Sequence, residues 1–376
     1  MFYTRRRGIV NRDSVFLIVV ISVSLLLLFL PTGFEGQFDH NVQRPRGQVL
    51  EVDNSLLKQF GLVREGVQTL RVRLLDGPYA GAEVSATNNV VGKMEIDKIF
   101  SVGDTAIMVL RLDGDRLVTA TAYDQYRLDA QLLLLAVFAF LLIGFAGWTG
   151  IRALVSFAFT ALLLWKVLLP AVLREWDPIW TSLLVVAVLC GTTLFLVGGL
   201  TRKALVAFLG SILGIGVTCA LALLFFGPLH VHGAVQPFAE TLLYSGYPQL
   251  DLSRIFLAGI FVSASGALMD LAMDISAAVN EVVRKKPDIS RWEAIWSGLA
   301  VGRAVSGTMV TTLLLAYAGG YMAMLMLFMG QGIAPLDMVN INYVAAEILK
   351  TIVGSFGLVT VAPFTAVVAG VLYAAK

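Results

Sequence analysis

A series of long apolar segments constrains this chain more than any other feature of its sequence. A membrane-spanning helix needs about 20 mostly apolar residues, and runs near that length follow one another from residue 132 almost to the C-terminus. Of the 376 residues, 57 % are hydrophobic and only 14 % are charged, far from the balance of a soluble domain. Most of the chain must therefore face lipid or other helices. The runs lie at about 132–147, 151–173, 179–200, 204–226, 255–273, 294–318 and 348–373.

One more apolar run, Ser14–Leu30, follows a basic N-terminal segment. The residues after it, PTGFEG, offer no small-x-small cleavage site, and the run is long for the core of a signal peptide. We therefore predict an uncleaved anchor helix within residues 1–31, which brings the total to eight spans. A shorter run, Met322–Met329, is either a half-helix or an interfacial segment, or it forms a ninth span.

Residues 32–128 hold most of the polar residues of the chain. Several short stretches alternate apolar and polar side chains as strands do, and the pair Asp113-Gly114 between two of them is a hairpin signal. These stretches lie at 69–77, 82–88 and 106–123. The pattern predicts a small β-barrel or β-sandwich. Because it contains no His/Cys cluster and no nucleophile arrangement, we interpret it as a docking or sensing module.

The basic loop residues set the expected orientation, because cytoplasmic loops carry an excess of Lys and Arg. Arg202-Lys203 and Arg284–Lys286 fall on the opposite side from the loops at 174–177 and 227–251. The N-terminus and both basic loops are then cytoplasmic. The expected fold is a membrane all-α helical bundle over residues 129–376, with about eight transmembrane helices or nine, and a small extracytoplasmic all-β domain.

Two carboxylates lie inside one of the apolar segments. In GALMDLAMDISAAVNEV (266–282), Asp270 and Asp274 stand one helical turn apart on the same face, and Glu281 returns to that face. Counting back from the basic loop at ~1.5 Å per residue places Asp270 roughly 20 Å from that end. Charges at such depth cost several kcal/mol unless they are paired or hydrated, so they rarely occur there without a function. The upstream residues of the face are small: Gly259, Ser263 and Gly266.

The next apolar run supplies a basic side chain. Arg303, in GRAVSGTMVTTLLLAYAGG (302–320), lies roughly 14 Å into its helix at ~1.5 Å per residue, close to the level of Asp274. Since two helices joined by a short loop pack antiparallel, we predict an ion pair between an aspartate and Arg303. Thr311 and Thr312 supply hydroxyl groups nearby, and Glu347, before the last run, is expected to line the same cavity.

These residues allow a structural and a functional interpretation. A structural ion pair could lock the two helices without carrying anything. Two carboxylates with flanking hydroxyls exceed what a lock requires, so we favour a protonatable relay or cation site formed by Asp270, Asp274, Arg303, Thr311 and Thr312. Glu281 and Glu347 are the further candidates.

Other functional classes find little support in the sequence. His230 and His232 lie in a polar loop without an obvious third ligand, so we interpret them as solvated residues and expect no metal site. Cys190 and Cys219 lie inside apolar runs. No Walker, HExxH or GxSxG motif occurs, so neither an enzyme nor a cofactor is expected. A net charge of +2 is too small to suggest nucleic acid as a partner.

The last third of the chain resembles a known family. Its segments MDLAMD, GRAVSGTMVTTLLLAYAGG and EILKTIVGSFGLVTVAPFTA look like the YibE/F family of bacterial membrane proteins. The order of anchor, external β domain and helical bundle is also similar to that family. The resemblance implies a multi-pass protein of the bacterial inner membrane, without an assigned activity.

The same third is also similar to the end of the SecD and SecF protein-export subunits of the resistance–nodulation–division superfamily. That resemblance implies a proton-carrying role for Asp270. It matches Arg303, Thr311 and Thr312 to a second helix and Gly354-Ser355 to a third. The sequence departs from those subunits in its additional Asp274, two added spans and a much smaller external domain, which puts any role in protein translocation in doubt.

Two functional hypotheses from different classes follow. The favoured one is an ion-coupled, most simply proton-coupled, transporter or energy-coupling subunit that uses the membrane carboxylates. The alternative is a non-transporting membrane scaffold or assembly factor whose β domain binds a partner. The expected partners are the lipid bilayer and an unidentified ion or substrate. A protein partner of the β domain and a homo-oligomer both stay open.

Overall fold

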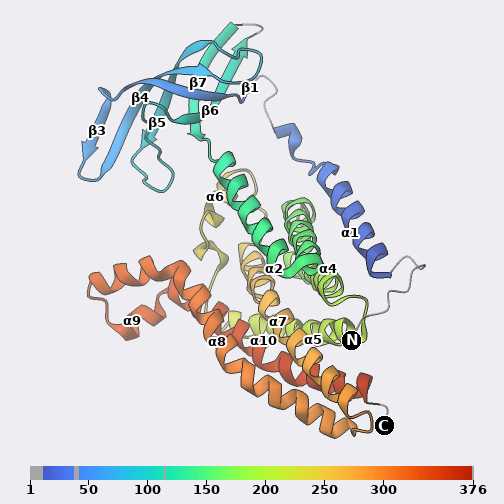
Figure 1. Ribbon diagram of the computed structural model, residues 1–376. Helices are drawn as coiled ribbons and strands as arrows, with labels where there is room; N and C mark the ends of the chain where they lie inside the picture. Colours follow the sequence, from blue (N-terminus) through green and yellow to red (C-terminus); the bar gives the residue numbers. More distant parts are fainter. Residues whose placement is uncertain (1–11, 38–41, 114–115, 375–376) are drawn as a thin grey trace. The chain divides into compact units, whose positions relative to one another are not determined.

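The computed structural model describes residues 12–37, 42–113 and 116–374. The chain divides into two compact units. One unit spans Gly33–Gly144 and contains the strands labelled in Figure 1, and the other contains helix α1 and the helices after Gly144. Each unit is described separately below.

The smaller unit is built around a closed barrel. Strand β2 pairs with β4, β4 with β5, β5 with β7, β7 with β6, and β6 returns to β2. All these pairs are antiparallel except β5–β7, which meet in parallel at Thr87 and Thr121. Strand β3 extends β4 as a hairpin and β1 adds to β6. The strands are β1 (Val42–Gln43), β2 (Arg46–Asp53), β3 (Leu57–Phe60), β4 (Val63–Leu74), β5 (Glu83–Val91), β6 (Thr105–Asp113) and β7 (Arg116–Gln125). Of the two predicted β architectures, the described strands form the barrel.

Alternation along the strands fills the barrel interior. Leu70, Val72 and Leu74 of β4 are at most 1 % exposed, and Met108 and Leu110 of β6 are fully buried. Successive side chains of a strand point to opposite faces, so these alternate positions form the apolar core. The expected hairpin at 106–123 is confirmed, since β6 and β7 pair from Ala106 with Gln125 to Asp113 with Arg116. Gly114 of the predicted turn lies outside the described residues.

Two buried amides also cross the barrel. Gln68 and Asn88 are fully buried. Gln68 accepts a hydrogen bond from the Phe100 N–H (3.0 Å) and donates to the Phe100 carbonyl oxygen (2.9 Å). Asn88 donates to Gln68 (3.1 Å) and to the Lys98 carbonyl oxygen (2.7 Å). These bonds satisfy the backbone of a segment that runs outside the ladder, as buried polar groups require.

Helices form the larger unit. Seven helical segments of the described chain are long and apolar enough to cross a membrane, with α2, a π-helical turn and α3 counted as one segment, Leu128–Leu173. The helices are α1 (Arg12–Phe29), α2 (Leu128–Leu163), α3 (Leu169–Leu173), α4 (Pro178–Gly198), α5 (Arg202–Phe226), α6 (Ala239–Tyr244), α7 (Leu252–Lys285), α8 (Arg291–Gly330), α9 (Pro335–Asn340) and α10 (Asn342–Tyr373).

The predicted runs at 132–147 and 151–173 lie on either side of a kink in the segment Leu128–Leu173, so the count of about eight spans stays a prediction. At this kink Gly147 has a non-helical backbone (φ 55°, ψ −127°), which divides the segment into two helical stretches. Glycine tolerates this backbone conformation because it has no Cβ atom. Arg152 lies 3.7 Å from Asp13 near the start of α1, and Arg174 donates to the Thr32 carbonyl oxygen beyond its end, so the second stretch alone runs the length of α1.

The run Met322–Met329 is neither a separate half-helix nor a ninth span. It is the end of α8, beyond a distortion at Tyr321 (φ −118°, ψ 16°).

Helices α5, α7 and α10 pack around a common core in which Leu268, Leu271 and Ile275 of α7 are fully buried. Glycines permit this close approach. A Cβ atom on Gly210 of α5 would lie 2.1 Å from Thr365 Oγ1 of α10, and one on Gly214 would lie 2.9 Å from Val361. These two glycines therefore let α5 and α10 pack closely. Gly216 of the same helix, by contrast, faces open space.

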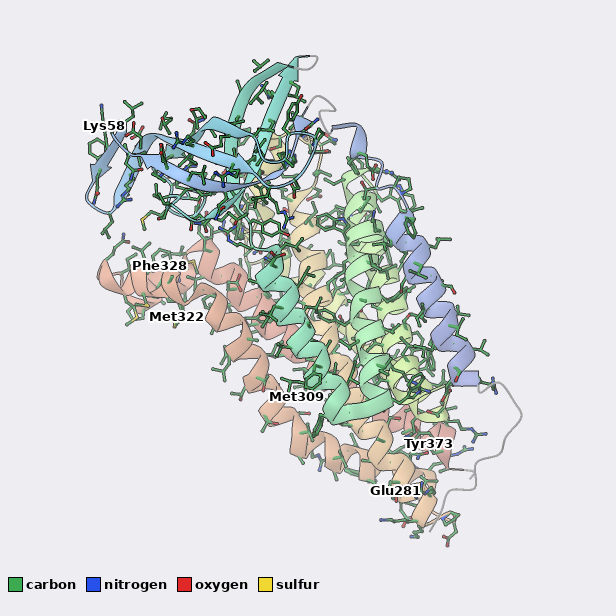
Figure 2. The ribbon with its side chains drawn as sticks, turned by 45° about the horizontal axis from the view of Figure 1, so that its top comes forward. Lys58, Glu281, Met309, Met322, Phe328 and Tyr373 are labelled. Carbon is green, nitrogen blue, oxygen red and sulfur yellow. The ribbon has the colours of Figure 1, made fainter. Side chains whose placement is uncertain are left out.

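Hydrogen bonds show which helix ends of this unit lie together. At one end, Ser276 of α7 donates to the Lys203 carbonyl oxygen (2.7 Å), and Arg291 donates to the carbonyl oxygen of Ala374 after α10 (3.5 Å). Figure 2 shows Glu281 and Tyr373 at this end. At the other end, His232 meets Asn342 at 2.6 Å. Both basic segments singled out in the sequence and the end of α10 thus lie at one end of the helices.

Candidate functional site

Asp270 and Asp274 lie near the middle of α7, on the side away from the core. Leu268, Leu271 and Ile275 on the core side are fully buried, whereas both aspartates are exposed. A helix turns by about 100° per residue, which places the carboxylates opposite the buried face. Among the described residues, no basic group lies within 4.0 Å of either carboxylate.

The aspartates belong to a line of exposed residues along α7, which we call the acidic stripe: Gly259, Ser263, Gly266, Asp270 and Asp274. A Cβ atom added to Gly259 or Gly266 would meet nothing within 4 Å, so there is open space beside the carboxylates. The Ser263 hydroxyl lies 2.9 Å from the Tyr317 hydroxyl of α8. The stripe therefore adjoins α8.

Arg303 lies at the predicted level but does not face the aspartates. A Cβ atom on the preceding residue, Gly302, would lie 3.4 Å from Ile275 of α7, so Arg303 is level with Asp274. The Arg303 guanidinium instead lies over the Trp296 ring, 5.5 Å from its centroid. In the described part of the chain no carboxylate comes within 4.0 Å of it, and the predicted aspartate–arginine ion pair is wrong for this structure.

The packing of α8 explains this difference. A Cβ atom on Gly298 or Gly302 would lie 2.8 Å from the Cβ atoms of Ala366 and Ala362, so these glycines dock α8 closely against α10. Arg303 follows Gly302 directly and is rotated by about 100° from that contact. The length of α8 and the depth of Arg303 along it could be predicted from the sequence. The direction of the Arg303 side chain could not, because it depends on which helix packs against Gly298 and Gly302.

Three other predicted site residues are not brought to the aspartates. The Thr311 and Thr312 hydroxyls donate to the carbonyl oxygens of Gly307 (3.1 Å) and Thr308 (2.9 Å) within α8 itself. Glu281 lies at the basic end of α7, 3.5 Å from the Arg284 side chain and also within ion-pair distance of Lys285.

Glu347 belongs to a second polar cluster, where α7, α8 and α10 meet. Its carboxylate lies 3.4 Å from Lys350 Nζ, and both side chains are less than a quarter exposed. Lys350 Nζ lies 4.7 Å from the centre of the Tyr317 ring, and the Tyr317 hydroxyl reaches Ser263 of the acidic stripe. Sequence reasoning missed Tyr317. The available signal was a single tyrosine in the apolar run LLLAYAGG.

Glu347 also lines a cavity of about 530 Å³ at the end of the helices opposite the basic segments. Glu240, Phe238, Tyr321 and Tyr343 line it as well. Two of these residues depart from regular backbone geometry, because Phe238 has a positive φ of 61° and Tyr321 interrupts α8. Such departures are uncommon for bulky residues and gather at functional sites. The cavity is large enough for a small molecule.

The loop histidines are bonded within the protein. His230 Nδ1 lies 3.1 Å from the Pro228 carbonyl oxygen, and His232 Nε2 lies 2.6 Å from Asn342 Nδ2. Among the residues that the structure describes, no group of three or more His, Cys, Asp or Glu side chains is placed to hold a metal ion.

Comparison with known proteins identifies the family. A family model described as YibE/F-like protein matches residues 134–375, which is more than half of the chain. No curated protein and no solved structure matches, so the resemblance to SecD and SecF stays a prediction. Together with the seven apolar helices, the family match indicates a membrane protein. The chain therefore belongs to the YibE/F family.

Proposed function

We propose that this protein is an ion-coupled membrane transporter or energy-coupling subunit, in which Asp270 and Asp274 carry the coupled ion, a proton. The observation behind the proposal is that both carboxylates are exposed and lack a basic partner in the described chain, halfway along an apolar helix. Ionised groups at that depth are costly, and their occurrence there is typical of proton relays and ion pathways.

The proposal includes an orientation in the bacterial inner membrane. Arg202, Lys203 and Arg284–Lys286 lie at one end of the helices, and an excess of basic residues marks the cytoplasmic side. The β-barrel and the cavity beside Glu347 are then extracytoplasmic, with the C-terminal end of α10 in the cytoplasm. This orientation takes the stretches before and after Gly147 as two separate crossings.

This orientation suggests how ions reach the aspartates. Glu347 lines the extracytoplasmic cavity and pairs with Lys350, which lies over the Tyr317 ring. The Tyr317 hydroxyl in turn meets Ser263 of the acidic stripe. Ser263 is seven residues from Asp270, or about 10 Å along the helix at 1.5 Å per residue. In the proposed cycle, separation of Tyr317 from Ser263 admits water to Asp270, and their contact closes the extracytoplasmic side.

The absence of an aspartate–arginine ion pair supports transport over a structural lock. A lock between α7 and α8 would require the two charges to meet, because an unpaired buried charge destabilises rather than fastens a helix pair. Here α8 is fastened to α10 by close glycine contacts, and Arg303 rests on Trp296. Within one chain, the two carboxylates are thus not held by a basic side chain.

The test is the decay of an imposed pH gradient across vesicles that contain the full-length protein. Wild-type protein should dissipate the gradient, and Asp270→Asn should fall to the rate of protein-free vesicles while it inserts normally. Glu281→Gln is the matched control, because it neutralises an acid of the same helix that is already paired with basic residues. Undiminished flux through Asp270→Asn would overturn the proposal.

One observation favours the alternative of a membrane scaffold. The β3–β4 hairpin exposes three large apolar side chains, Leu56 (64 %), Phe60 (62 %) and Leu62 (87 %), as a partner-binding surface would. A scaffold predicts that deleting residues 40–125 abolishes the cellular role while Asp270→Asn preserves it. A transporter predicts loss of the role in Asp270→Asn.

A further inference from the structure

Helix α8 leaves most of its surface uncovered. Only five of its 40 residues are buried, whereas α10, of similar length, buries 14 of 32. The uncovered side is not purely apolar, because Arg303, Gly307 and Thr311 follow one another along it at four-residue spacing and are all exposed. We call these three residues the basic stripe.

The acidic and basic stripes carry opposite charges on neighbouring helices. The Ser263–Tyr317 hydrogen bond places the acidic stripe next to α8. None of Asp270, Asp274 and Arg303 has an oppositely charged partner within 4.0 Å in the described chain. In lipid, such charges must be covered by protein or water, since each costs several kcal/mol when left to the hydrocarbon.

A second copy of the chain meets this requirement by symmetry. Asp274 and Arg303 are level with each other along the α7–α8 pair. A two-fold axis along the membrane normal preserves depth, so Asp274 of one protomer is also level with the partner's Arg303. A two-fold interface repeats each contact, which pairs both charges twice.

The backbone of both stripes has room for such a contact. A Cβ atom added to Gly266 of the acidic stripe or to Gly307 of the basic stripe would meet nothing within 4 Å. Small residues on exposed faces let helices of separate chains approach closely in lipid. Gly298 and Gly302 of the same helix differ from Gly307, because α10 of the same chain already packs against them.

We propose that this protein forms a two-fold homodimer in the membrane through these stripes, with Asp270 and Asp274 of each protomer facing the partner's Arg303. The ion site is then completed by the partner chain. The proposed dimer does not depend on the proposed ion coupling. Its test measures the mass of the protein rather than proton flux, so one proposal can fail while the other stands.

The experiment measures the mass of full-length protein in lipid nanodiscs. Wild-type protein is expected at twice the 40.6 kDa of one chain. Asp274→Arg and Arg303→Asp should each be monomeric, because each places like charges across the axis. Co-expression of these two single variants under different tags should restore a dimer that carries both tags. At positions 274 and 303 of that mixed pair, one protomer carries two cations and the other two carboxylates, so the contacts between these positions become attractive again.

The mixed pair separates contacts between chains from contacts within a chain, because an ion pair inside one protomer cannot be restored by another chain. In case a charge reversal prevents folding, co-expressed Asp274→Cys and Arg303→Cys proteins should be joined by a short bismaleimide in native membranes. In the control, Asp337→Cys on α9 is co-expressed with Arg303→Cys in place of Asp274→Cys, and this pair should give no covalent dimer. A monomeric wild type, a dimer unaffected by both reversals, or cross-linking equal to the control would overturn the inference.

Discussion

Arg303 is level with Asp274 along the α7–α8 pair, yet its guanidinium rests on Trp296 and not on the carboxylate. The cause lies one residue earlier, where Gly302 fixes α8 against Ala362 of α10 and so directs Arg303 away from that contact. The relationship leaves two carboxylates and one cation available on the exposed face of a membrane helix pair. Both the proposed ion site and the proposed dimer follow from it.

Close helix packing predicts opposite effects for two glycines of α5. Gly210→Ala should lower stability by about 1–3 kcal/mol, because the new methyl group would lie 2.1 Å from Thr365 Oγ1 and 3.0 Å from its Cα. Gly216→Ala faces open space and should be neutral or stabilising by up to about 1 kcal/mol, since alanine favours the helix. Thermal unfolding in detergent compares the two. Equal losses would mean that the α5–α10 contact is looser than described.

The buried amide network predicts a strong effect inside the barrel. Gln68→Ala removes the partners of the Phe100 N–H and carbonyl groups, which should cost about 1–3 kcal/mol and speed amide exchange around residue 100. Gln59→Ala is the control, because the only described hydrogen bond of the Gln59 side chain is an exposed one to the Gly61 carbonyl oxygen. Hydrogen-exchange mass spectrometry of the full-length protein checks both. Unchanged exchange in Gln68→Ala would contradict the assignment.

The barrel should lose stability in acid only at low pH. The hydrogen bond from Arg46 Nε to Asp76 (2.7 Å) holds the pKa of the Asp76 carboxyl below its usual value of 3.8. A group whose pKa is lower in the folded state stabilises it above the unfolded pKa and loses that effect as pH falls through the folded one. Asp76→Asn should therefore weaken the acid dependence below about pH 4 and leave the dependence between pH 5 and 8 unchanged. Exchange rates across this pH range provide the measurement.

The Glu347–Lys350 pair should behave as a coupled unit. Lys350→Met leaves Glu347, whose side chain is only 16 % exposed, without its cation, and should cost about 1–3 kcal/mol. Adding Glu347→Gln should recover part of the loss, because the amide carries no charge to desolvate. The free energies of unfolding of the wild type, both single variants and the double variant form a double-mutant cycle that measures the interaction. Additive losses would show that the pair makes no net interaction.

The sequence predicts elements whose pattern is local. The hairpin at 106–123 follows from strand alternation, and the level of Arg303 follows from helix length alone. The acidic face of α7 was likewise readable from the spacing of Asp270 and Asp274.

What the sequence could not supply depends on contacts between distant segments. The direction of Arg303 is set by Ala362, and the role of Tyr317 by Ser263 and Lys350, residues of other helices. The kink at Gly147 could not be predicted from the apolar pattern, because one glycine can redirect a helix without a polar loop. In each case the deciding neighbour lies on another element or in the local backbone rather than in the hydrophobic pattern.

The most direct test of the central claim asks whether the aspartates of α7 carry protons. Dicyclohexylcarbodiimide forms adducts with carboxyl groups that hold a proton in apolar surroundings, and peptide mass spectrometry locates the adduct. In vesicles with the full-length protein, proton carriage by these carboxylates predicts an adduct on Asp270 or Asp274 and none on Glu281, with proton flux falling in proportion to labelling. An adduct on neither aspartate, or full flux through fully labelled protein, would contradict it.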